Sequence, residues 1–289
     1  MDALRNFLMA ERDVRVVSLV PSLTETVFAL GAGDALVGRT RYCVEPAEDV
    51  ANVPVVGGPK DPDVPAILSL QPKLVLMGVE ENRREDYDRL RTAGVDILPV
   101  RVRSVGDVAP VILELGRRLD AMDAARAMAA EIEGAAEAVV AFVADIQRAS
   151  GESLLHSFCP VWRDPWIVAS QGTYLADVLR RVGLPSLLHH AESPDGPQYR
   201  EATPLEIVET DPGIVLLPSE PYPFGTDDRD EVLSWPVRAC RDNQVHLVDG
   251  RMLAWYGART ASALHALSLL ALRWVGAEDD PPSAPPTFH

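Results

Sequence analysis

Short apolar runs alternate with amphipathic segments over the first hundred residues. Four short runs predict strands: 15–20, 36–40, 74–78 and 96–100, the first of which has the apolar pattern of a buried parallel strand. Three segments between them have helical spacing: 22–31, 64–71 and 82–94. Ser22 or Thr24 is expected to cap the first helix, and Gly31 or Gly33 to end it. The alternation predicts a small parallel α/β lobe over residues 1–103.

The pattern changes between residues 104 and 150, where no strand signal is found. Residues 104–119 predict one helix, with Ser104 and Asp107 near its start. Residues 120–149 form an alanine-rich run with helical spacing, and a helix of about 28 residues would be roughly 40 Å long. Gly134 lies inside this run and costs about 1 kcal/mol relative to alanine, too little to break it. We therefore expect a rigid helix over this segment.

The alternation of strand and helix restarts after Gly151. Strands are expected at 153–158, 213–219 and 244–250. Helices are expected at 172–183, 203–211, 228–240 and 260–275. The helix at 203–211 has a strong start signal, since Thr203 can cap it and Pro204 occupies its first position. Residues 151–289 are therefore predicted to form a second α/β lobe.

One unit of the first lobe recurs in the second. "AILSLQPKLVLMG" (66–78) and "LEIVETDPGIVLLPS" (205–219) each join a helix end, a Pro turn and an apolar strand, and in both cases a loop, a helix and another strand follow. Chance similarity between ordinary βα units is the alternative explanation, but the matched order and spacing argue against it. The predicted fold class is thus α/β, with two Rossmann-like lobes with parallel sheets, one long helix (within 104–150) between them, and a ligand cleft between the lobes.

Composition narrows the possible partners. The chain of 289 residues has a formal net charge of -16, which argues against nucleic acid and anionic membranes, because both require a basic surface. No run approaches the roughly 18–20 apolar residues that would cross a bilayer. The three cysteines are far apart and are expected to be ordinary thiols. The N-terminal stretch does not read as a secretory signal, so the protein is cytoplasmic if Met1 is its native start.

Aromatic and arginine residues gather after the predicted strands, where ligands bind in open α/β sheets. Their rings and guanidinium groups suit a large flat ligand that carries carboxylate or amide groups. The residues expected to bind it are Pro21, Ser22, Arg41, Tyr42, Trp162, Trp166, Tyr199, Tyr222, Arg251, Trp255 and Tyr256. The alternative for any single aromatic residue is that it covers the core.

Sequence motifs for common enzymes and cofactors are missing. There is no glycine-rich nucleotide loop, no GxSxG elbow and no HExxH, so we expect neither an enzyme nor a built-in cofactor or metal. His189 or His190 is the candidate axial ligand for the metal of a bound chelate, and a surface loop pair is the alternative.

Several of these segments together resemble a known family. "RVVSLVPSLTETVFALG", "LSLQPKLVLMG", "EATPLEIVETDPGIVLLPS" and "VHLVDGRMLAWYGAR" are similar to the cobalamin-binding proteins of bacterial vitamin B12 uptake. More broadly they resemble the helical-backbone (class III) substrate-binding proteins of ABC importers for cobalamin, haem and ferric siderophores. The resemblance implies two lobes bridged by one helix, a monomer outside the cytoplasm, and a metal chelate as ligand, with cobalamin or another corrinoid first.

The resemblance also implies roles for individual residues. Tyr42, Tyr199 and the group Arg251, Trp255 and Tyr256 match places that touch the corrin in cobalamin-binding members, whereas Gly78 stands near the place of a missing aromatic residue. Glu85 and Glu206 lie one residue beyond the positions of the glutamates that meet the ABC permease dimer. The alternative is a cytoplasmic protein or enzyme that handles a corrinoid or chelate in the same cleft without docking to a transporter.

Overall fold

The computed structural model describes residues 14–150, 155–186, 188 and 198–276. The chain forms two compact units. The first contains the described residues up to Gly134 together with Trp255–Ala261, and the second contains Ala135–Ala254 together with the residues from Ser262 onward. Residues 104–134, expected in a separate helical segment, thus lie in the first unit, and so does a short stretch of the predicted C-terminal lobe.

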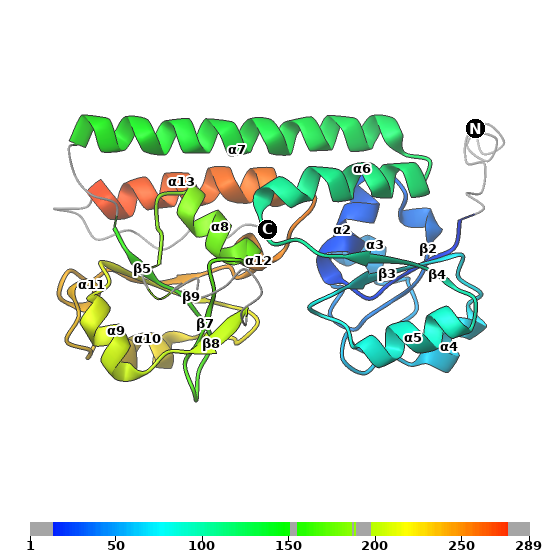
Figure 1. Ribbon diagram of the computed structural model, residues 1–289, viewed down its shortest axis with the longest axis horizontal. Coiled ribbons are helices and arrows are strands. Elements are labelled where there is room, and N and C mark those ends of the chain that lie inside the picture. Colours follow the sequence, from blue (N-terminus) through cyan, green and yellow to red (C-terminus); the bar gives the residue numbers. More distant parts are fainter. Residues whose placement is uncertain (1–13, 151–154, 187, 189–197, 277–289) are drawn as a thin grey trace. The chain divides into compact units, whose positions relative to one another are not determined.

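The first unit is built on a four-stranded parallel sheet with the order β2-β1-β3-β4. Its strands are β1 (Val16–Ser18), β2 (Leu36–Arg39), β3 (Leu74–Gly78) and β4 (Asp96–Val100). Its short helices are α2 (Pro21–Ala29), α3 (Ala47–Val50), α4 (Val64–Ser69), α5 (Arg84–Thr92) and α6 (Val108–Arg118), with 3-10 turns at Gly33–Ala35 and Val105–Asp107. In Figure 1, α6 lies on one side of the sheet, and α4 and α5 lie on the other. The parallel lobe predicted from the alternating pattern is confirmed.

Helix α2 starts differently from the expectation. Neither Ser22 nor Thr24 caps it; the N-cap is Val20, and Pro21 occupies the first helical position. The hydroxyl of Thr24 instead donates to the carbonyl oxygen of Val20 at 3.0 Å. Proline needs no acceptor at this position and has the φ angle of a helix, so the turn forms without a side-chain cap. Sequence cannot separate these two start signals when they stand next to each other.

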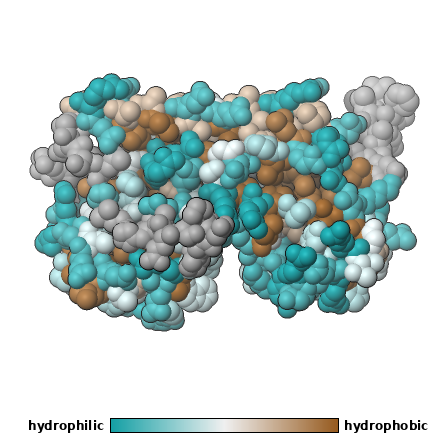
Figure 2. Space-filling view, in the orientation of Figure 1, coloured by the Kyte–Doolittle hydropathy of each residue, from teal (hydrophilic) through white to brown (hydrophobic). Residues whose placement is uncertain are grey.

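The predicted long helix is α7 (Met122–Ser150), with 29 residues. Its buried positions are spaced by four and three residues, as on one face of a helix: Ala125, Ala129, Ile132, Ala136 and Val139. The small side chains allow close packing on α6, where a Cβ at Gly116 would lie 2.3 Å from the Cβ of Ala125. Figure 2 shows hydrophilic residues recurring along its outer edge. Helix α7 begins in the first unit and continues into the second.

The second unit contains two small sheets. A parallel sheet has the order β10-β9-β5, from β5 (Ser157–Phe158), β9 (Ile214–Pro218) and β10 (Val245–Val248). An antiparallel sheet has the order β6-β7-β8, from β6 (Pro160–Trp162), β7 (Ile167–Ala169) and β8 (Tyr199–Glu201). The antiparallel sheet was not predicted, because its strands of three residues are too short to give a clear period. The run at 153–158 yields only β5, and residues 153 and 154 lie outside the described part.

The helices of the second unit are α8 (Tyr174–Arg181), α9 (Pro204–Thr210), α10 (Thr226–Val232), α11 (Arg238–Arg241), α12 (Arg251–Ala254) and α13 (Thr260–Gly276), the last of which begins in the first unit. The prediction of a single helix at 228–240 is wrong, because two helices, α10 and α11, cover this stretch. Pro236 lies in the interruption, and the residue before a proline is disfavoured in helical conformation. Thr203 caps α9 as predicted.

The repeat read from the sequence is visible in the backbone of each unit. Gln71, before β3, and Asp211, before β9, are both left-handed, with φ of 49° and 40°, and each precedes a proline. Gly94, before β4, and Asn243, before β10, are left-handed too, with φ of 83° and 55°. In both units the two strands that follow are parallel neighbours. The same strand–helix–strand path is therefore built twice with the same two turns.

Each unit has its own apolar core. In the first, Val17 and Leu19 of the β1 segment pack with Val75 of β3 and with Ile67 and Leu90 from the helices. In the second, the core includes Phe158, Ile207, Val215, Leu217 and Val245. Within the part of the chain that the structure describes, no helix combines the length and apolar character needed to cross a membrane.

Candidate functional site

The carboxyl end of the first sheet is organised by one asparagine. Asn82 lies in the loop after β3, and its Oδ1 accepts the backbone N–H of Gly78 at 2.7 Å. Its Nδ2 donates to the carbonyl oxygens of Pro59, at 3.0 Å, and Leu19, at 3.4 Å. Three loops at the carboxyl edge are therefore held together by a single buried amide, which gives the edge a fixed shape.

Tyr42 is the most exposed of the predicted ligand-binding aromatic residues at this edge. It follows β2 and is 57% exposed. The neighbouring Arg41 binds both carboxylate oxygens of Asp61, at 3.0 and 2.7 Å, and its guanidinium carbon lies 5.9 Å from the centre of the Tyr42 ring. These hydrogen bonds, which Arg41 donates to Asp61, raise the pKa of Arg41. The Tyr42 ring is thus presented to solvent beside a charge-paired guanidinium.

Tyr256 also belongs to the first unit, although it comes near the end of the chain. Its hydroxyl lies beside Ser22 and the carboxyl group of Glu81, and both Ser22 and Tyr256 are buried. Burial, followed by the nearby charges of Glu81 and Glu80, raises the pKa of Tyr256 well above its ordinary value. The neighbouring Trp255 is buried as well. The structure therefore brings Tyr256 and Ser22 together, as part of a packed polar cluster.

The second unit carries a row of aromatic rings. Trp162, at the end of β6, is 47% exposed and meets Tyr222 edge-on, with 5.4 Å between ring centres. Tyr222 lies 4.7 Å from Phe224, which in turn stacks on Trp166 at 5.9 Å with an interplanar angle of 2°. Trp166 packs against the core of this unit, which fits the alternative of a core-covering ring, whereas Trp162 presents its ring to solvent.

The remaining predicted ligand-binding residues are also accounted for. Tyr199 opens β8 and is 51% exposed. Arg251, at the start of α12, bonds to Asp249 two residues before it, with 2.9 Å between Nη2 and Oδ2. Pro21 is half-buried at the start of α2. Exposed aromatic rings are therefore present on each unit, and the predicted arginines have carboxylate partners.

The two predicted docking glutamates have different surroundings. Glu85 is exposed in the first turn of α5. Glu206 accepts the backbone N–H of Thr203 at 2.7 Å, which completes the capping box of α9, and lies 3.1 Å from Arg200. The backbone hydrogen bond from Thr203 is the main cause of its lowered pKa. Glu206 thus has a structural task at the start of α9 in addition to any role in docking.

Metal-ligating groups do not gather in the part of the protein that the structure describes, where no three His, Cys, Asp or Glu side chains are placed to hold an ion. His189 and His190 lie outside the described residues. Cys43 and Cys159 are buried, and burial raises the pKa of the Cys159 thiol to about 12. A thiol whose pKa is raised stays mostly protonated at neutral pH, which favours the interpretation of these two cysteines as ordinary buried thiols.

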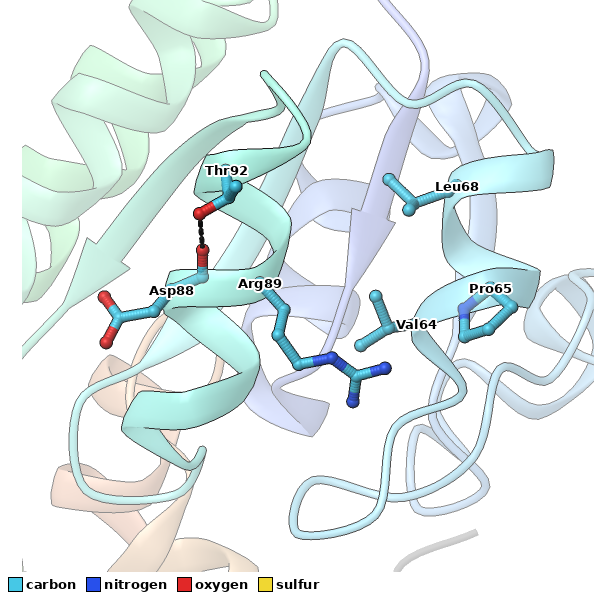
Figure 3. A pocket seen from close by; sticks show the side chains of 6 residues that line it. All are labelled: Val64, Pro65, Leu68, Asp88, Arg89 and Thr92. Carbon is cyan, nitrogen blue, oxygen red and sulfur yellow. Dashed lines mark hydrogen bonds between the residues drawn. The ribbon is translucent and has the colours of Figure 1, made fainter.

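A groove of about 460 Å³ lies on the first unit, and none of the residues predicted to bind ligand lines it. Figure 3 shows that it separates the apolar side chains of α4 from the polar side chains of α5. Its lining residues are Val64, Pro65, Leu68, Asp88, Arg89 and Thr92. None of these follows the carboxyl end of a strand, so the groove is not the site indicated by the sequence.

Sequence reasoning did not reveal the contacts that hold the site in place. Asn82 and Asp61 are polar loop residues among many, and a single sequence gives no sign of their contacts. Asp228 is buried in the first turn of α10, where it accepts the Gly225 backbone N–H at 2.8 Å and pairs with Arg163. Arg163 was a candidate because it follows a predicted strand, but the sequence gives no sign of its pairing with Asp228.

Comparison with known proteins identifies the class. A family model described as periplasmic binding protein matches residues 16–245. The chain therefore belongs to the periplasmic binding protein family.

Two groups of similar proteins are named for the ligand that they bind. The chain is 27% identical over 204 residues to a protein named "Cobalamin-binding protein" from Halobacterium salinarum, a match that covers 70% of this chain and 53% of that one. It is 36% identical over 90 residues to a "Vitamin B12-binding protein" of Yersinia pestis, covering 31% of this chain and 32% of the relative. The chain thus matches about half the length of the first of these relatives.

Solved structures share the fold. The vitamin B12-binding protein BtuF of Vibrio cholerae has a TM-score of 0.74 at 18% identity, covering 91% of this chain and 98% of its own. A periplasmic heme-binding protein from Pseudomonas aeruginosa has a TM-score of 0.77 at 23% identity, covering 91% and 94%. At such low identity the likeness shows the fold, and ligand choice must come from this chain's own residues.

Proposed function

We propose that the protein is a solute-binding protein for a metal chelate, with cobalamin or another corrinoid as the first candidate, and that it delivers this ligand to an ABC importer outside the cytoplasm. The observation that carries the proposal is the presence of solvent-exposed aromatic rings on each unit: Tyr42 on the first, and Trp162 and Tyr199 on the second. Exposed aromatic rings supply flat apolar contact surfaces for a macrocycle. The role requires binding and release without catalysis.

The charge of the candidate site favours a corrinoid over haem or an anionic siderophore. Arg41 is paired with Asp61, and Arg251 with Asp249, so the predicted arginines are neutralised within their own units. Glu80, which also lies 4.0 Å from Arg103, and Glu81 are near Tyr256 at the carboxyl edge of the first sheet. A ligand with several carboxylates would meet these acidic groups, whereas the amide side chains of a corrinoid are neutral and can both donate and accept hydrogen bonds.

Binding measurements with three ligands test this proposal. Cyanocobalamin, haemin and a ferric siderophore are titrated separately into the purified protein, and binding is followed by calorimetry and visible absorption. We expect micromolar or tighter 1:1 binding of cyanocobalamin and weaker binding of the two anionic chelates. Tyr42→Ala and Tyr199→Ala are each expected to weaken binding by about tenfold, since removal of a stacked ring costs about 1 kcal/mol or more. Leu205→Ala, a change at an exposed apolar residue of α9, is the matched control.

A cytoplasmic role in corrinoid or chelate handling is the second candidate. The observation that favours it is the local use of Glu206 in the capping box of α9, which occupies one of the two groups proposed to dock on a permease. Fractionation of cells that express the native gene separates the two candidates. Protein found only in the cytosol would exclude delivery to an importer and leave the ligand proposal intact.

A further inference from the structure

A single arginine ties the β6–β7 turn to helix α10 in the second unit. The Arg163 side chain is 17% exposed, and its guanidinium bonds to Asp228 and, at 2.9 Å, to Glu231. Arg163 directly follows Trp162, and α10 begins shortly after Tyr222. The arginine therefore connects the two chain segments that supply the exposed Trp162 ring and the Tyr222 ring on which it rests.

The contacts of Arg163 leave its side chain little freedom. Its guanidinium carbon lies 5.4 Å from the centre of the Trp166 ring, within the range of a cation–π contact. Asp228 is fixed in turn, because it accepts the Gly225 backbone N–H at the start of α10. Hydrogen bonds to Asp228 and then to Glu231 raise the pKa of Arg163, so the guanidinium keeps its charge. A planar donor held from three sides sets the geometry of the turn beside it.

We propose that Arg163 is a positioning residue for ligand binding: by locking the β6–β7 turn onto α10 it holds the Trp162 indole against Tyr222, ready to meet the flat face of the ligand. This inference rests on the proposed function. The physical reason is preorganisation, since a half-exposed indole that already has one orientation loses less side-chain entropy when the ligand binds. Removal of the Arg163 contacts is expected to weaken ligand binding by about tenfold. The Trp162 side chain and the β6–β7 turn would then be free in the unbound protein, and binding would have to order them.

A double-mutant cycle between Arg163 and Trp162 tests the inference. The dissociation constant for cyanocobalamin is measured for the wild type, Arg163→Gln, Trp162→Ala and the double variant, below the unfolding midpoint of each. We expect Arg163→Gln to weaken binding about tenfold when Trp162 is present and less than twofold when it is alanine. A purely structural role for Arg163 would lower the unfolding midpoint without this dependence on Trp162.

Two further variants sharpen the test. Asp164→Asn removes a carboxylate that is 84% exposed and 3.3 Å from Arg163 Nε, so it is expected to leave affinity unchanged. Arg163→Lys keeps the charge but loses the planar arrangement of donors, and we expect its affinity to lie between those of the wild type and Arg163→Gln. If Arg163→Gln does not fold, Arg163→Lys replaces it in the double-mutant cycle.

The outcomes separate this inference from the proposed function. If the wild type binds none of the three chelates, the proposed function fails and the inference falls with it. If the wild type binds cyanocobalamin and Arg163→Gln binds it equally well, or the loss is the same with and without Trp162, the positioning role alone is overturned.

Discussion

Arg259 and Glu25 form a two-bond ion pair across 234 positions of sequence, with 2.7 Å between Nε and Oε2. Both side chains are about four-fifths buried. The Arg259 guanidinium also lies 5.0 Å from the centre of the Trp255 ring. This pair fastens the stretch Trp255–Ala261 to helix α2 of the first unit and so explains why a segment from the end of the chain belongs there.

Removal of one partner of this pair should destabilise the protein. Arg259→Gln leaves the Glu25 carboxylate partly buried without its guanidinium, and we expect a loss of about 2–3 kcal/mol in the free energy of unfolding. Urea unfolding followed by circular dichroism measures it. Arg84→Gln is the control, because its partner Asp88 lies on the same exposed helix face and such pairs contribute about 0.5 kcal/mol or less. Equal losses in the two variants would contradict this account.

Two glycines should respond to alanine in opposite directions. Gly257 has φ of +110°, and a Cβ there would lie 2.2 Å from Thr26 Oγ1, which accepts the Ala258 backbone N–H at 3.1 Å. Gly257→Ala is expected to cost about 2 kcal/mol or more through strain and the disturbed hydrogen bond. Gly134→Ala, in α7, meets nothing within 4 Å and is expected to stabilise the protein by up to about 1 kcal/mol. Thermal unfolding of both variants gives the comparison; destabilisation by Gly134→Ala would show that α7 needs the glycine.

Substitutions at two left-handed turn residues of the repeat, Gln71 and Gly94, should have different effects on stability. Gln71 is left-handed with φ of 49°, a conformation that glycine adopts without strain. Gln71→Gly is therefore expected to stabilise the protein by up to about 1 kcal/mol or to be neutral, in spite of the higher entropy of glycine in the unfolded chain. Gly94→Ala places a side chain in open space but at φ of 83°, and should destabilise it by about 1 kcal/mol. Urea unfolding of the two variants measures the change in the free energy of unfolding. A more stable Gly94→Ala variant would contradict the explanation from left-handed backbone strain.

His246 should make stability depend on pH. Burial, with a smaller effect of the Arg229 charge, lowers its pKa from 6.5 to about 4. Because the unfolded chain binds the proton more readily between these values, the stability that comes from neutral His246 is present above pH 6.5 and is lost as pH falls toward 4. The full effect is on the order of 3 kcal/mol.

A pair of unfolding series checks the histidine prediction. The free energy of unfolding of the wild type is measured from pH 7 to pH 4 and compared with that of His246→Gln, which cannot take up the proton. The wild type should lose more stability over this range than the variant. Parallel curves would show that His246 does not cause the pH dependence.

The regular helices and strands were predictable because their hydrophobic pattern and their start and turn residues indicate the same elements. The strands β3 and β4 are short apolar runs, the helix α7 has a clear helical period, and Thr203 with Pro204 marks the start of α9. Tyr42 follows a strand of the parallel sheet, as the general rule for ligand sites in such sheets led us to expect, whereas Trp162 and Tyr199 lie in the antiparallel sheet, which was not predicted.

The contacts of the site were not predictable from the sequence. The attachment of Arg259 to Glu25 and the hydrogen bonds of Asn82 join residues far apart in the chain, and no local pattern reports such pairs. The short antiparallel strands carry too few residues for a period to be seen. The buried state of Trp255 and Tyr256 likewise follows from tertiary packing, since their sequence neighbourhood resembles that of an exposed loop.

The most direct test of the central claim is an equilibrium titration of the purified wild-type protein with cyanocobalamin, with haemin and a ferric siderophore as competitors. The account predicts a 1:1 complex of micromolar or tighter affinity that neither competitor displaces at equal concentration. Absence of binding to all three ligands would contradict the claim that these exposed aromatic rings receive a metal chelate.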